Sequence, residues 1–139
     1  MVINRTSYDG LTGLFEYLMG HYMPGRELKL TVCHNAAMLN HFGTRDIELK
    51  AMLYQSEVKD WYVLVIAEGL SRPEMVACHE FAHLMQMVRG DLLFSPEKRI
   101  FTWKGRTYPA SMAYDTRPWE VEAFRMEDKY RKEYIRFNK

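Results

Sequence analysis

The sequence lacks a long hydrophobic segment and has few cysteines. Its longest uninterrupted apolar run, residues 61–67, is far shorter than the roughly 20 residues that a membrane-spanning helix needs. Cys33 and Cys78 are the only cysteines, so a disulfide framework is not expected, and two free thiols fit a reducing compartment. No basic segment followed by an apolar core opens the chain, so we expect a cytoplasmic protein without a signal peptide.

An excess of charge of either sign is also missing. Nineteen Lys and Arg residues face eighteen Asp and Glu residues, which leaves a formal charge of +1. A protein that binds nucleic acid through bulk electrostatics usually carries a clear basic excess, so a nucleic-acid partner is not expected. The length of 139 residues and the ordinary apolar content of 47% predict one globular domain over residues 1–139.

The hydrophobic pattern predicts an α+β fold that begins with a helix and a small sheet. Apolar residues recur at helical spacing over residues 8–22. Residues 27–33 and 46–54 alternate, and residues 61–67 form a continuous apolar run, so we expect a three-stranded sheet whose last strand is buried on both faces. Residues 34–44 fit a loop or a short helix.

A second long helix is predicted to follow the apolar strand. Ser71 and Glu74 fit a capping box, and Pro73 suits a first helical turn. The helix should run to about residue 89, with Gly90 in a left-handed conformation after its end. Beyond it, residues 100–108 predict a hairpin with a tight glycine turn, and Pro118 opens a last helix toward Phe137.

The second long helix carries the motif His79-Glu80-x-x-His83. Residues four apart lie one above the other on a helix, so both imidazoles can bind one zinc ion at about 2.0–2.1 Å. Glu80 lies about 100° round the helix from His79, where it can take a proton from water and pass it to a leaving amine. The spacing therefore predicts a catalytic zinc site with Glu80 as its general base.

A catalytic zinc ion commonly has three protein ligands, so one more is needed. No histidine follows His83, which excludes every class with a third histidine downstream, and Gln86 and Arg89 stand where a metzincin has Gly and His. The segment before the helix also lacks the cysteine ligand of a deformylase. A carboxylate on the last helix remains as the source of the third ligand.

Two carboxylates open the last helix, Glu120 and Glu122. They lie about 200° apart around a helix, so only one of them can face the metal. We prefer Glu120, because the small side chain of Ala123 on the same face lets the two helices approach closely. Glu122 remains the alternative ligand.

The HExxH motif, followed by a helical Glu-x-x-Ala (Glu120, Ala123), resembles the gluzincin zinc metallopeptidases, in particular minimal single-domain and ImmA/IrrE-like members. The segment over residues 103–123 also resembles small metallopeptidase-like proteins of phages and prophages. The resemblance implies zinc bound by His79, His83 and Glu120. The family often has Asp or Asn four residues after the ligand Glu, to support a ligating histidine, whereas this chain has Phe124.

Peptide hydrolysis also needs a hydrogen-bond donor for the tetrahedral oxyanion. Tyr108, Tyr114 and Arg117 lie between the two helices, and each could supply it, although both tyrosines could equally pack in the core. We take Tyr114 as the candidate.

The leading hypothesis is a zinc-dependent endopeptidase whose peptide or protein substrate binds in extended form along the strand over residues 46–54. One alternative is a catalytically silent metal-binding or interaction module of phage type. Another is a SprT-like, DNA-associated protease, against which the missing downstream histidine and the near-neutral charge both weigh. The sequence makes no prediction of the oligomeric state.

Overall fold

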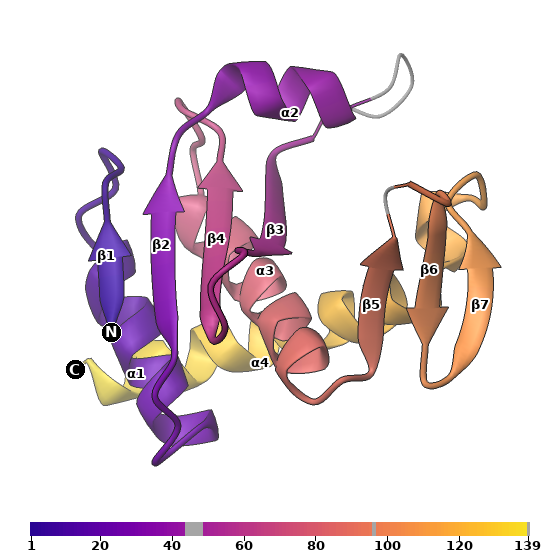
Figure 1. The fold of residues 1–139 in the computed structure, drawn as a ribbon. Helices are drawn as coiled ribbons and strands as arrows, with labels where there is room; N and C mark the ends of the chain where they lie inside the picture. Colours follow the sequence, from indigo (N-terminus) through magenta and orange to yellow (C-terminus); the bar gives the residue numbers. More distant parts are fainter. Residues whose placement is uncertain (44–48, 96, 139) are drawn as a thin grey trace.

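A computed structural model describes residues 1–43, 49–95 and 97–138. Two sheets and four α-helices build the described chain (Figure 1). The elements in chain order are β1 (Val2–Asn4), α1 (Leu11–Tyr22), β2 (Lys29–Cys33), α2 (Ala36–Phe42), β3 (Ala51–Gln55), β4 (Trp61–Ile66), α3 (Pro73–Val88), β5 (Leu92–Ser95), β6 (Ile100–Trp103), β7 (Arg106–Pro109), the 3₁₀ turn η1 (Tyr114–Thr116) and α4 (Pro118–Phe137).

The main sheet has four strands in the order β1-β2-β4-β3, one more than the sequence predicts. β1, β2 and β4 are parallel, whereas β3 pairs antiparallel with β4 at one edge (Figure 1). The additional strand, β1, spans only three residues, too few to show an alternating pattern. It is held by its pairing with β2, which a local sequence pattern does not contain.

Partner strands set the ends of β2 and β3, and both are shorter than predicted. β2 begins at Lys29, which pairs with Trp61 at the start of β4. β3 begins at Ala51, which pairs with Ile66 at the end of β4. The first part of the predicted strand, residues 46–48, lies outside the described residues. Between β2 and β3 the short-helix interpretation is confirmed as α2, where the Asn35 side chain accepts a hydrogen bond from the helix N-terminus.

Helices α1, α3 and α4 lie on one face of the main sheet (Figure 1). This arrangement explains why β4 is only partly covered on its other face: Trp61 and Val63 are half-buried, whereas Val65 and Ile66 are both buried. The prediction of a strand buried on both faces therefore holds for the second half of β4. The core beneath the sheet is formed by apolar side chains that include Leu14, Phe15, Leu18, Leu30, Val32, Leu64, Ile66, Ala77, Phe81, Leu84, Ala123 and Tyr130.

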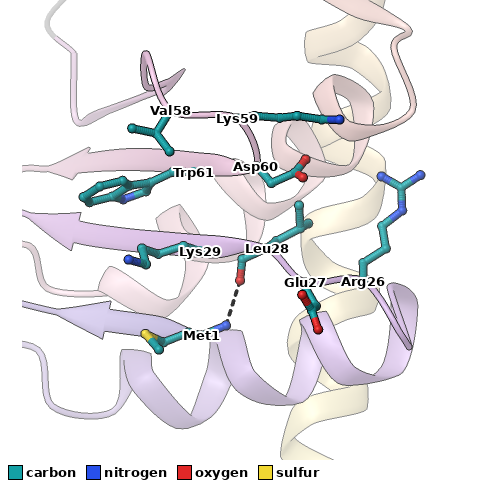
Figure 2. A pocket seen from close by; sticks show the side chains of 9 residues that line it. All are labelled: Met1, Arg26, Glu27, Leu28, Lys29, Val58, Lys59, Asp60 and Trp61. Carbon is teal, nitrogen blue, oxygen red and sulfur yellow. Dashed lines mark hydrogen bonds between the residues drawn. The ribbon is translucent and has the colours of Figure 1, made fainter.

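The N-terminal segment is attached to the sheet at both ends. α1 begins at Leu11, later than predicted, and the preceding Tyr8 donates a hydrogen bond from its hydroxyl to the Ala67 carbonyl, 2.6 Å away. At the opposite end of the sheet, the Met1 ammonium group donates to the Leu28 carbonyl at 2.7 Å. Figure 2 shows the shallow, mixed-charge hollow around this contact, in which no residue of the predicted metal site takes part.

The capping box predicted for α3 is wrong. The helix begins at Pro73, so the N-cap is Arg72, and no side chain caps it. Ser71 therefore lies one residue too early for its hydroxyl to reach the first free amides of the helix. The proline prediction is correct, because Pro73 occupies the first turn, where its missing N–H leaves no helical hydrogen bond unmade.

The predicted end of α3 is confirmed. Gly90 has φ of +79°, and its amide donates to the Met87 carbonyl, while the Asp91 amide donates to the Gln86 carbonyl. This pair of hydrogen bonds is the Schellman motif, which satisfies carbonyls that the last helical turn leaves free.

The second sheet is antiparallel, with the order β5-β6-β7. The predicted hairpin is its β6–β7 pair, turning at Lys104 and Gly105, both of which have positive φ. β5 was not predicted. This sheet has a small core of its own, formed by Leu92, Trp103 and Trp119, which packs it beside the start of α4 (Figure 1).

α4 begins at Pro118 and ends at Phe137, as the sequence predicts. In the described ranges, no helix is both long enough and apolar enough to cross a membrane.

Candidate metal centre

The packing of α3 against α4 brings His79, His83 and Glu120 together. All three residues are buried, with exposed fractions of 7%, 8% and 6%. One ligand atom from each lies within 4.8 Å of the others, which would allow them to hold a metal ion. Among the described residues no other cluster of three such side chains occurs, and the upstream His21, His34 and His41 of the sequence take no part.

Both imidazoles direct the same nitrogen at a single carboxylate oxygen. The Nε2 atoms of His79 and His83 each lie 2.9 Å from Oε1 of Glu120. Tetrahedral ligands around a zinc ion at 2.0–2.1 Å lie about 3.3 Å apart. The two nitrogen–oxygen distances would therefore need to lengthen by only a few tenths of an ångström to accept the ion.

The His79 ring is held from behind by Glu127. Its Nδ1 lies 2.8 Å from Oε2 of Glu127, and because a carboxylate only accepts, Nδ1 donates. The resemblance placed a supporting group at position 124, where instead the Phe124 ring packs against His79 with centroids 4.6 Å apart. Glu127 lies two helical turns after Glu120 and on the same face, and this spacing is the sequence signal that could have identified it.

Gln86 holds the His83 ring in the same way. Nδ1 of His83 lies 2.8 Å from Oε1 of Gln86, an amide oxygen that only accepts. Both histidines thus donate from Nδ1, and each directs Nε2 at Glu120. This Nε2 donates to the carboxylate when the ring is doubly protonated and offers a lone pair to a metal ion when the ring is neutral. Two imidazole nitrogens and a carboxylate oxygen are a donor set that zinc prefers, so the residues present fit that ion.

Protons can take the place of a metal in this cluster. Burial lowers the pKa of His83, but its hydrogen bond to Glu120 and the charges of Glu80 and Glu120 outweigh burial and raise the pKa to about 9. The pKa of His79 is raised by the same balance of effects. Burial raises the pKa of Glu120, but the hydrogen bonds from both histidines reverse this and lower the pKa to about 2. The metal-free site therefore binds protons that a metal must displace.

Glu80 lies beside the triad and is 9% exposed. Burial raises the pKa of its carboxyl, although the nearby His83 and His79 partly oppose the shift. Within the part of the chain that the structure describes, its carboxylate makes no hydrogen bond. The charges of both histidines and of Glu120 act on the Glu80 carboxyl, which therefore lies within electrostatic range of the triad.

Of the three predicted oxyanion donors, Tyr114 lies at the triad. Its hydroxyl donates to Oε1 of Glu120 at 3.0 Å, and burial, followed by the charge of Glu120, raises its pKa, which keeps the hydroxyl protonated. The Arg117 guanidinium lies over the Tyr114 ring, 5.5 Å from its centroid. Tyr108 packs against Trp119 in the small core instead.

Glu122 lies apart from the two imidazoles. Its Oε1 accepts hydrogen bonds from Nη2 of Arg89 at 3.0 Å and from Nε2 of Gln86 at 3.2 Å. The carboxylate thus forms an ion pair with Arg89, the residue that follows α3. The structure thus groups Glu120, and not Glu122, with the histidines.

In comparisons with known proteins, no family model, no curated protein and no solved structure matches the chain. Function must therefore be inferred from the residues of the site and their geometry.

Proposed function

We propose that this chain is a zinc metallopeptidase that hydrolyses peptide bonds. The observation that supports the proposal most is the buried triad of His79, His83 and Glu120, with the Glu80 carboxyl beside it. The sequence spacing of the triad and its split between two packed helices support the narrower assignment to the gluzincin type.

Zinc held by the triad would supply a Lewis acid that polarises the scissile carbonyl and lowers the pKa of a water molecule. Glu80 then accepts a proton from the attacking water and returns it to the amine that leaves. Its raised pKa suits both steps, because a general base works best when its pKa approaches the operating pH. Tyr114 donates its hydroxyl hydrogen to the oxyanion as the carbonyl carbon becomes tetrahedral.

The substrate is a peptide or protein segment that binds in extended form along β3. This strand is at the edge of the main sheet and contacts α3, the helix that carries the HExxH motif (Figure 1). An edge strand has unpaired backbone N–H and C=O groups, which can pair with an added strand. The net charge of +1 gives no electrostatic reason to add a nucleic-acid partner.

The test combines elemental analysis with cleavage of a denatured protein. Wild type should bind about one zinc ion per chain, and His83→Ala should lose it. Glu80→Gln should keep the zinc and lose at least ~100-fold in cleavage rate, because it removes the proton acceptor and leaves the ligands unchanged.

Each outcome separates the hypotheses. Wild type that stays metal-free after incubation with zinc at neutral pH would refute the metal site. Zinc binding with no cleavage that depends on Glu80 would favour a catalytically silent module. If the protein binds DNA and changes its mobility in a gel, and if added salt abolishes this binding, the DNA-associated protease would be favoured.

A further inference from the structure

Gln86 is a polar side chain that is completely buried between α3 and α4. Its amide contacts three groups, of which one is the metal ligand His83 and two belong to α4. The Nε2 atom lies 3.0 Å from the Trp119 carbonyl oxygen and 3.2 Å from Oε1 of Glu122.

The partners on α4 fix which way the amide points. A carbonyl and a carboxylate can only accept hydrogen bonds, so both N–H groups of Gln86 must face them. The amide oxygen must then face His83, whose Nδ1 lies 2.8 Å away and has to carry the proton. In the neutral ring, Nε2 of His83 is then the nitrogen without a proton, and it lies on the side of Glu120, where a metal ion would bind.

The same amide also fixes the backbone that precedes the third ligand. Trp119, whose carbonyl receives the Gln86 hydrogen bond, immediately precedes Glu120 in the first turn of α4. Glu122, the other acceptor, is held in turn by Arg89 at the end of α3. One buried side chain therefore contacts a ligand on α3 and the backbone beside a ligand on α4.

We infer that Gln86 is a positioning residue that holds His83 in its metal-binding tautomer. The inference rests on the proposed zinc site, because it concerns how that site is prepared for the ion. Groups that orient metal-bound histidines commonly contribute about 10–100-fold to metal affinity.

The experiment compares three variants by competition for zinc with a chelating dye. Gln86→Leu removes the acceptor for His83 while keeping an apolar side chain of similar size. In the double variant Gln86→Glu/Glu122→Gln, the carboxylate at 86 accepts from His83 and from the new amide at 122, and the formal charge is unchanged. Glu122→Gln alone is the matched control, because the Gln86 amide can still donate to the oxygen of the new side chain.

We expect Gln86→Leu to bind zinc at least ~10-fold more weakly than wild type, and the double variant and the control to stay within about threefold. If Gln86 only ties the helices together, the double variant, which lacks the donor for the Trp119 carbonyl, should be as weak as Gln86→Leu. That result would overturn the inference, as would a Gln86→Leu protein with wild-type affinity.

A second measurement reports the tautomer directly. In zinc-loaded wild type, the imidazole nitrogen spectrum of ¹⁵N-labelled protein should show a slowly exchanging Nδ1 proton on His83, which the double variant keeps and Gln86→Leu loses. Absence of this proton in zinc-loaded wild type contradicts the inference even if Gln86→Leu does not fold. A wild type that binds no zinc refutes the proposed function and this inference together, whereas zinc binding that is insensitive to Gln86 refutes this inference alone.

Discussion

Three polar side chains of the candidate metal centre converge on one atom, Oε1 of Glu120. Two imidazole nitrogens and the Tyr114 hydroxyl lie within 3.0 Å of it. A carboxylate with an exposed fraction of 6% is costly to bury unless its charge is compensated, and here the hydrogen bonds from both histidines lower its pKa to about 2. Glu122 makes none of these contacts, so single substitutions can measure the contributions of Glu120 and Glu122 to metal binding separately.

Glu120→Ala should weaken zinc binding by ~10-fold or more, because it removes the ligand on α4. Glu122→Ala should leave the affinity nearly unchanged, within about threefold. Gln86 keeps the Trp119 carbonyl as a partner after this change, so the support of His83 persists. Competition with a chelating dye measures both variants, and the reverse ranking would identify Glu122 as the ligand.

Glu127→Ala should weaken zinc binding by ~10–100-fold, because His79 loses the carboxylate that orients its ring. Asp128→Ala is the matched control: it removes the neighbouring carboxylate, which contacts only Lys132 and Arg131 among the described residues. Dye competition and elemental analysis compare the two proteins. Equal zinc affinity in both variants would mean that the contact with His79 contributes nothing to metal binding.

At the scale of elements, the two ligand-bearing helices are positioned by their ends as well as by their buried faces. α3 stops at a Schellman motif, after which Gly90 directs the chain into β5. α4 starts at Pro118, so Glu120 lies within its first turn, next to the small core of the second sheet. The termini of these helices thus determine where the ligands meet.

Gly90→Ala should lower the free energy of unfolding by about 1 kcal/mol. The residue has φ of +79°, and an added Cβ would meet no atom within 4 Å, so backbone strain alone supplies the loss. Gly20→Ala is the control of opposite sign: this helical glycine also has free space, and alanine there should stabilise α1 by about 0.5–1 kcal/mol. Urea denaturation measures both changes, and a loss of stability in Gly20→Ala would contradict the reasoning.

For the whole molecule, the protons of the metal centre link stability to pH. The folded pKa of His83 is raised to about 9 from 6.5, so its contribution to stability is complete below pH 6.5 and is lost as the pH rises through 9. The folded pKa of Glu120 is lowered from 4.5 to about 2, so its contribution is present above pH 4.5 and is lost as the pH falls toward 2. Both effects belong to the metal-free protein.

A zinc ion that binds the triad would have to displace the histidine protons, so its affinity should rise between pH 6.5 and pH 9. We therefore expect the melting temperature of the metal-free protein to fall over this range, and the stabilisation by a fixed zinc concentration to increase. Thermal unfolding with and without zinc at several pH values measures both trends. A zinc-induced shift that is the same at pH 6.5 and pH 9 would show that no proton is displaced.

Local sequence signals predicted much of the fold. The pattern of apolar residues located α1 and the strands β2 and β4, because each buries one face or one run of apolar residues. Gly90 and Pro118 marked helix ends through backbone conformations that their own chemistry favours. Local reasoning failed for β1 and β5, which are short and depend on partner strands, and for the Ser71 cap, which the helix start misses by one residue.

The sequence by itself determined the pair of imidazoles and the acid between them, because residues four apart on a helix meet whatever the rest of the chain does. Only the tertiary structure decided between Glu120 and Glu122, because that choice depends on how α4 is rotated against α3. It also decided which groups hold the two histidines, Glu127 on one and Gln86 on the other. Hydrogen bonds of this kind depend on distances of less than 3 Å between side chains of packed helices, and spacing along the chain does not fix such distances.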